Sequence, residues 1–125
     1  MKRIINTPDA PAAIGPYSQA VEANGTLYIS GQLPVNPTTG IIEATDVNGQ
    51  ALQVLKNIES VLKAAGYTYN DVVKSTVFLS DMANFAGMNE AYKRAYQTDC
   101  PARSTFAVRD LPMGALVEIE TIAVK

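Results

Sequence analysis

One stretch in the middle of the chain restricts the possible folds more than any other feature. Between residues 51 and 65, apolar side chains recur at spacings of four and three, as on one face of an α-helix: Ala51, Leu55, Ile58, Leu62 and Ala65. Thr45 or Asp46 can cap the start of this helix, and Gly66 stands where a left-handed residue commonly ends one. Gly49, near the start, is unfavourable within a helix, and the sequence offers no reason for it. The pattern predicts an amphipathic helix that buries one face.

Strand-like segments lie on both sides of this helix. Residues 19–23 and 27–30 flank Asn24-Gly25, a strong turn signal, and predict a β-hairpin whose second strand ends at Gly31. A second amphipathic helix is predicted over Asn84–Tyr96, with Phe85, Met88, Tyr92, Ala95 and Tyr96 on one face. Three further segments rich in β-branched or aliphatic residues predict strands: Val72–Leu79, Ser104–Val108 and Leu116–Val124.

The resulting order is β-β-α-β-α-β-β, within one domain that covers residues 1–125. This order predicts an α+β fold with one mixed or antiparallel sheet and both helices on one face of it. The other face of the sheet then has no covering layer, and an exposed apolar surface usually finds a partner. We therefore expect a homo-oligomer.

Composition excludes several classes of function. Hydrophobic residues make up 47% of the 125-residue chain and charged residues 18%, and the formal net charge is −2, so we expect no general affinity for nucleic acid. No stretch has the length of a membrane span or a signal peptide, and Cys100 is the single cysteine, so a cytoplasmic protein is predicted. The chain has no histidine, which excludes Ser/His/Asp and Cys/His catalysis and histidine-based metal sites. Without a phosphate loop, a dinucleotide fingerprint or an EF-hand, the sequence indicates no cofactor and no metal.

Two kinds of charged residue stand out near the end of the chain. Alternation along the last strand puts Glu118 and Glu120 on the face opposite Val117 and Ile119. Such carboxylates are usually solvent-facing, but in a pocket at a subunit boundary one of them could handle a proton. Arg103 opens the preceding strand, where its planar fork suits either a small carboxylate ligand or a structural salt bridge to one of these glutamates.

Other candidate site residues carry weaker signals. Asn89 flanks the apolar face of the second helix, and Tyr17 and Ser30 each lie near a glycine-rich bend. Such groups are more often structural than ligand-binding, although Gly31 after Ser30 allows a ligand close to the backbone. Cys100 precedes Pro101 in a loop and has no motif-fixed basic neighbour, so we expect an ordinary thiol.

These residues also belong to three longer strings, namely residues 10–19 (APAAIGPYSQ), residues 30–37 (SGQLPVNP), and residues 101–104 (PARS) continuing through Leu111-Pro112 to residues 117–120 (VEIE). With these motifs the whole chain resembles the RidA family, the reactive intermediate deaminases also called YjgF-type or L-PSP proteins. The resemblance implies a chorismate-mutase-like α+β fold. It also implies a homotrimer whose sheets form a central β-barrel, with ligand clefts between subunits.

The family's activity, as implied for this chain, is hydrolysis of reactive 2-enamine and 2-imine acids released by pyridoxal-phosphate enzymes. The substrates are 2-aminoacrylate, 2-aminocrotonate and their imine tautomers, and the products are 2-keto acids and ammonia. By resemblance, Arg103 grips the substrate carboxylate and Glu118 is the acid near the imine, while Glu120 has a less direct role. The cleft-lining positions are Tyr17, Ser30, Gly31, Asn89 and Thr105, the last standing where many members carry cysteine.

This set of groups suffices for imine hydrolysis. Holding the carboxylate lowers the entropic cost of water attack, and a carboxyl group in a partly dry cleft can exchange protons with the imine nitrogen or with water. Two alternatives remain at this stage: a non-catalytic trimer that binds a keto acid or an amino acid and acts in regulation, and a ribonuclease or translation inhibitor. The acidic composition and the absence of histidine disfavour the latter.

Overall fold

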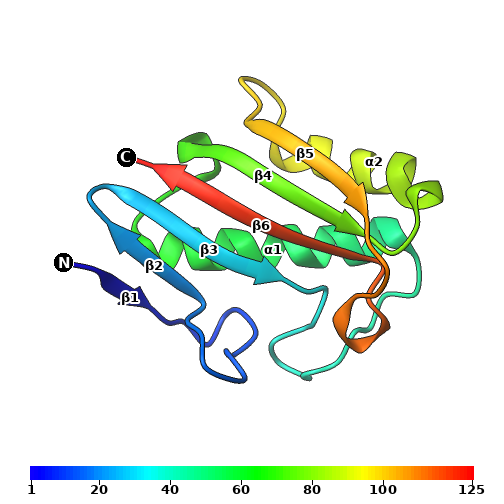
Figure 1. Ribbon diagram of the computed structural model, residues 1–125, viewed down its shortest axis with the longest axis horizontal. Coiled ribbons are helices and arrows are strands. Elements are labelled where there is room, and N and C mark those ends of the chain that lie inside the picture. The colour runs from blue at the N-terminus through cyan, green and yellow to red at the C-terminus, as the bar shows by residue number, and fades with distance from the viewer.

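The computed structural model describes all 125 residues and has one six-stranded sheet and two α-helices (Figure 1). The helices are α1 (Val47–Ala65) and α2 (Phe85–Ala95). The strands are β1 (Arg3–Ile5), β2 (Ala20–Ala23), β3 (Thr26–Gln32), β4 (Val72–Leu79), β5 (Ala102–Ala107) and β6 (Val117–Val124). Three short 3₁₀ helices connect them, at Tyr69–Asp71, Met82–Asn84 and Pro112–Gly114. Neither α-helix has the length and apolar character needed to cross a membrane.

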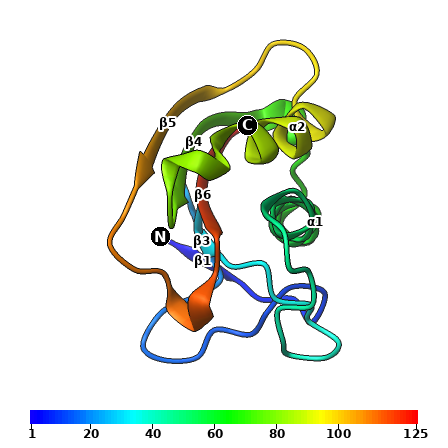
Figure 2. The same cartoon turned by 90° about the vertical axis from the view of Figure 1, so that its right-hand side faces the viewer.

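The sheet is mixed, with the strand order β1-β2-β3-β6-β4-β5. Every neighbouring pair is antiparallel except β4 and β5, which are joined through α2 and run parallel. Viewed from the side, both helices lie against the same face of the sheet (Figure 2). These features confirm the predicted α+β fold with a mixed sheet and both helices on one face.

Helix α1 begins and ends as its sequence predicts. The Asp46 side chain accepts a hydrogen bond from the Gly49 backbone N–H at 2.9 Å, and Gly66 ends the helix in the left-handed region at φ 86°. The structure also explains Gly49, because a Cβ there would lie 2.8 Å from the Asp46 Oδ1 atom and 3.0 Å from the Ala44 Cβ. Gly49 therefore lowers the intrinsic stability of the helix, but it leaves room for the Asp46 side chain to cap the N-terminus closely.

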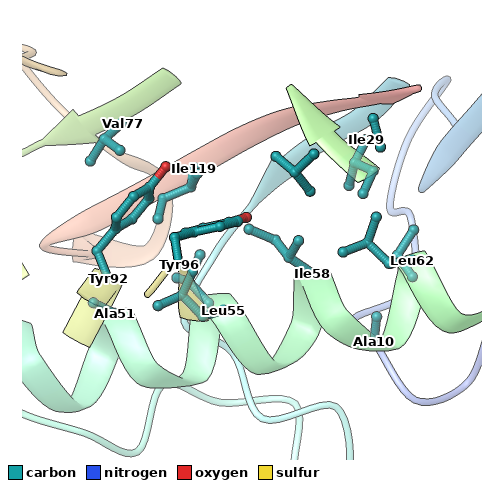
Figure 3. Close-up of a cluster of buried hydrophobic side chains, with 14 of the residues drawn as sticks. Ala10, Ile29, Ala51, Leu55, Ile58, Leu62, Val77, Tyr92, Tyr96 and Ile119 are labelled. Carbon is teal, nitrogen blue, oxygen red and sulfur yellow. The ribbon is translucent and has the colours of Figure 1, made fainter. Parts of the chain in front are cut away.

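The core lies between the helices and the sheet (Figure 3). Ile58 and Leu62 of α1 and Ile119 of β6 are fully buried there, as the helical and strand periodicities predict. Tyr92 of α2 and Tyr96, which follows the end of α2, extend into the same layer, and Figure 3 shows their rings among aliphatic side chains. The burial of Val117, Ile119 and Thr121 also determines which residues lie on the opposite face of β6. Because side chains alternate along a strand, Glu118 and Glu120 point away from the helices.

The face of the sheet opposite the helices is uncovered in the single chain (Figure 2). Large apolar side chains on this face are about half exposed: Ile4, Tyr28, Phe106 and Val124. This is the uncovered face that the element order predicts, and it has the apolar character of a surface that pairs with another molecule.

One strand, β1, is not predicted by the sequence. Its three residues are too few for a period-two pattern, and it forms by pairing with β2 at the sheet edge. Arg3 holds it there, because its guanidinium donates to the Glu22 carboxylate at 2.9 Å and to the Ala65 carbonyl at 3.0 Å. Tyr67 donates to the same carboxylate at 2.6 Å, and together these bonds hold the pKa of Glu22 below its ordinary value.

Candidate active site

Arg103 lies on the helix-covered side of strand β5. It is opposite Ser75 of β4, and its guanidinium carbon is 4.7 Å from the centre of the Tyr92 ring and 5.6 Å from that of Phe85. No carboxylate pairs with it, since the chain's three salt bridges are elsewhere, and Arg3 is the only arginine whose side chain donates hydrogen bonds within the chain. The structural salt bridge to Glu118 or Glu120 is thus absent from the single chain. The donors of Arg103 remain available for a ligand.

Arg103 faces a cavity of about 680 Å³ between β5 and α2. Asn89 lines the same cavity, as do the Phe85 and Tyr92 rings and Cys100. The only other charges there are Glu90 and Lys93, which pair with each other at 3.6 Å on the exposed surface of the helix. A cation with free donors, one amide and apolar walls together fit a small carboxylate compound.

From the sequence, the aromatic residues of this cavity were interpreted only as part of the hydrophobic core. Phe85, Asn89, Tyr92 and Tyr96 are spaced by four, three and four residues, so one stripe of α2 carries the amide together with three rings. Tyr92 and Tyr96 are buried as predicted, but both also line the cavity. The usable signal was Asn89, a polar residue among the rings of this stripe, which lines the same cavity as Arg103.

Thr105 and Cys100 contribute two more polar atoms near Arg103. Thr105 is two residues further along β5, so its side chain is on the same face as that of Arg103, opposite Val77. Its hydroxyl oxygen is buried without a hydrogen-bond partner. Cys100 is exposed and lines the cavity, and its thiol donates to the Tyr96 carbonyl at 3.3 Å. The thiol that we expected to be an ordinary loop residue therefore borders the Arg103 cavity.

Glu118 lies elsewhere, on the uncovered face of the sheet. It is paired with Phe78 of β4 and packs directly on Gly31 of β3. A Cβ added at Gly31 would overlap the Glu118 Oε2 atom and lie 3.0 Å from its Cδ atom, so glycine is what allows the carboxyl group to occupy this position. Burial, and to a smaller extent the neighbouring Glu120, raise the pKa of Glu118 above its ordinary value.

Gly31 also lines a second cavity, of about 310 Å³, together with Tyr17, Leu33 and Met113. The Tyr17 side chain is half exposed, and its hydroxyl accepts a hydrogen bond from the Ile14 N–H at 3.3 Å. The Ser30 hydroxyl instead donates to the Ser18 carbonyl at 2.6 Å, which ties β3 to the segment just before β2. Gly31 thus connects an acid with a raised pKa, which packs on it, to a partly apolar hollow that it lines.

The candidate residues therefore form two groups. Arg103, Asn89 and Thr105 lie on the helix side of β5, whereas Glu118 and Gly31 lie on the uncovered face of the central strands. Within one chain, therefore, Arg103 and Glu118 do not lie side by side. The reason is alternation, since Arg103 shares a face with the buried Ser75 and Glu118 with the outward-facing residues of β6.

Comparison with known proteins adds independent information. Residues 7–125 match the family model described as endoribonuclease L-PSP. A curated mouse protein named 2-iminobutanoate/2-iminopropanoate deaminase is 50% identical over 125 residues, covering 100% of this chain and 93% of its own length. The crystal structure of a Rid-family protein from Yersinia pestis superposes with a TM-score of 0.97 at 49% identity over 100% of both chains. The structure of TdcF from E. coli with bound serine gives a TM-score of 0.94 at 44% identity, covering 98% of each chain.

Proposed function

From the premise that this chain belongs to the L-PSP family, which includes the RidA deaminases, we propose that it is a 2-iminobutanoate/2-iminopropanoate deaminase. The chain is an enzyme that binds small-molecule substrates and hydrolyses reactive enamine and imine acids to 2-keto acids and ammonia. The observation that carries the proposal is Arg103, a guanidinium with no partner in the chain, in a cavity that suits a small carboxylate. The relative with bound serine supports the same size and class of ligand.

We further propose that the working protein is a homotrimer in which each site is completed by a second copy. The uncovered apolar sheet face supplies a surface for association. Glu118 and Arg103 lie on opposite faces of one chain, so the Arg103 cavity of one copy would meet the Glu118 face of its neighbour. Such a head-to-tail contact closes into a ring, as a trimer with a central barrel requires.

In this site Arg103 is the anchor. Its two parallel N–H groups hold the substrate carboxylate bidentately, which fixes the adjacent imine carbon in one orientation. Asn89 and the unpartnered Thr105 hydroxyl add neutral polar contacts on the same side. Fixing the substrate in advance removes much of the entropic barrier to attack by water.

Glu118 handles the protons. Its raised pKa keeps a larger fraction of the carboxyl group protonated, so it can donate to the imine nitrogen and make the carbon electrophilic. The resulting carboxylate takes a proton from the attacking water as the new C–O bond forms. A further proton shift from the hydroxyl group to nitrogen releases ammonia and leaves the keto acid, so one water is consumed for each ammonia formed. General acid–base help of this kind contributes roughly 10²–10⁴-fold.

The activity is tested by adding the protein to a threonine dehydratase reaction and recording the rate at which 2-oxobutanoate appears. We expect wild type to accelerate keto-acid formation and Arg103→Ala to abolish the gain. Arg109→Ala is the matched control, because Arg109 is 97% exposed and contacts only Asp110, at 3.8 Å. No acceleration by wild type, or an equal loss in both variants, would refute the proposal.

Complementation tests whether the site lies between copies. Arg103→Ala and Glu118→Gln are each expected to be inactive. When rings form at random from equal amounts of the two variants, however, one interface in four on average joins an intact Arg103 to an intact Glu118. Unfolding the two variants together and refolding them should therefore restore about a quarter of wild-type activity. If both residues served one site from the same chain, the mixture would stay inactive.

A further inference from the structure

The Arg103 cavity shows an unusual way of holding a cation. A partly buried guanidinium is normally neutralised by a carboxylate, which then occupies its hydrogen-bond donors. Here the guanidinium instead lies over two aromatic rings, with the centre of the Tyr92 ring at 4.7 Å and that of Phe85 at 5.6 Å from the guanidinium carbon. Ring faces attract a cation through their quadrupole without using its N–H groups. Arg103 is thus kept in place while its charge and its donors stay available.

Tyr92 is the nearer ring, and it is itself held firmly. Its side chain is almost completely buried, and its hydroxyl group points into the layer between α2 and the sheet (Figure 3). Burial raises the pKa of the Tyr92 phenol, so it stays neutral beside Arg103. The fully buried Ser75 lies close enough to moderate that rise, although the contact does not have the geometry of a full hydrogen bond.

A series of ring contacts connects Tyr92 to the other helix. The centres of the Tyr92 and Tyr96 rings are 4.6 Å apart, and the Tyr96 ring meets that of Tyr69 at 5.2 Å in an edge-to-face arrangement. Tyr69 ends the series, because its hydroxyl group donates to the Leu55 carbonyl of α1 at 2.6 Å. The ring beneath Arg103 is therefore one end of an aromatic series whose other end is joined to α1, while the position of Tyr92 itself is set by its own burial.

We propose that Tyr92 is a positioning residue that aims the Arg103 guanidinium at the substrate carboxylate through the face of its ring. This inference rests on the proposed function, in which Arg103 binds that carboxylate. Tyr92 itself takes no part in the chemistry, because its hydroxyl group lies buried in the layer between α2 and the sheet (Figure 3). What matters for binding is the aromatic face, and the phenol oxygen is dispensable.

The test measures binding of 2-oxobutanoate, the keto-acid product, by titration calorimetry with purified full-length protein. Tyr92→Leu removes the ring face and should raise the Kd roughly 3- to 30-fold, the range expected for a desolvated cation–π contact. Tyr92→Phe keeps the face and should bind within about 2-fold of wild type. Phe85→Leu removes the more distant ring and should give a smaller weakening, which keeps the test available if Tyr92→Leu does not fold.

Tyr69→Leu is the control for a purely structural effect. It removes the far end of the same ring series without touching Arg103, so it should lower thermal stability while leaving the Kd within about 2-fold of wild type. Equal weakening by Tyr69→Leu and Tyr92→Leu, or weakening by Tyr92→Phe as large as that by Tyr92→Leu, would overturn the inference. Unchanged binding in Tyr92→Leu would do the same.

Binding and turnover separate this inference from the proposed function. A wild-type protein that binds 2-oxobutanoate but does not hydrolyse the imine contradicts the deaminase function only, and the variant series then still decides the role of Tyr92. A wild-type protein that binds no 2-oxobutanoate contradicts the role of Arg103 as a carboxylate anchor, and the positioning role of Tyr92 fails with it.

Discussion

The contact between Gly31 and Glu118 yields the sharpest prediction. Gly31 does not have a positive φ, so its backbone accepts alanine without conformational strain, and the only obstacle is the carboxyl group packed on it. In Gly31→Ala the new methyl carbon would lie 3.0 Å from the Glu118 Cδ atom and 3.3 Å from its Cγ atom. Because such atoms normally pack at about 3.5–4.0 Å, the carboxyl group must retreat by roughly 0.5–1 Å, and its overlapping oxygen by more.

This displacement sets the size of the effect on catalysis. Misplacing a catalytic group by on the order of 1 Å costs about 10²-fold in rate, which corresponds to ~2.7 kcal/mol of transition-state stabilisation. The obstructed atoms are the end of a flexible side chain, so the fold itself should tolerate the methyl group. We expect kcat/KM in the dehydratase-coupled assay to fall about 100-fold, with the affinity for 2-oxobutanoate nearly unchanged because Arg103 is not disturbed.

A double-mutant cycle tests the cause of the loss. If Gly31→Ala acts by moving Glu118, then adding it to Glu118→Gln should cost little more than Glu118→Gln alone. Independent, additive losses would show that the methyl group blocks substrate or water directly. Activity of Gly31→Ala within about 3-fold of wild type would refute the geometric reasoning altogether.

Three other predictions concern stability and its link to function. Because the pKa of Glu118 is raised, the folded state binds more protons than the unfolded chain above pH 4.5. The free energy of unfolding therefore falls as the pH rises from 4.5 toward the raised pKa. Melting curves of Glu118→Gln should lack this fall. Thr105→Val removes a buried hydroxyl group that has no hydrogen-bond partner, so it should raise the melting temperature. If that hydroxyl group contacts the ligand, the same variant should bind 2-oxobutanoate more weakly. Equal affinity would remove Thr105 from the site. Asn57→Leu leaves the Leu33 and Val35 carbonyls without the donor that holds them at 3.0 and 2.9 Å, and urea unfolding should show a loss of about 1–3 kcal/mol for each; a loss below about 0.5 kcal/mol would contradict this role.

Sequence patterns predicted the elements well where the interactions that form them are between residues close together in the chain. The Asp46 cap, the Gly66 ending and the helical spacing from Ala51 onward placed α1 because each acts within a few residues of its own position. Strand β4 was predicted with its observed bounds, since its β-branched run is long and its faces alternate. Strand β1 was missed because its pairing with β2 and the bonds from Arg3 are long-range.

The candidate site divides in the same way. The sequence by itself determined which chemistry is available, because a chain without histidine and with one cysteine leaves an arginine and carboxyl groups to do the work. It also fixed that Glu118 points away from the core, through simple strand alternation. The motif residues identified Arg103, which began as an even choice between a ligand anchor and a salt bridge.

Only the tertiary structure shows that one chain supplies Arg103 with no carboxylate partner, which favours the ligand anchor. The parallel pairing of β5 with β4 puts Arg103 beneath α2, where it meets the Tyr92 and Phe85 rings and no carboxylate. The same sheet puts Glu118 on the opposite face, against Gly31. The order of strands in a sheet is set by contacts between distant segments and leaves no trace in local spacing. For this reason the sequence could name both groups of candidate residues, while the fold alone shows that they lie on opposite faces of the sheet in one chain.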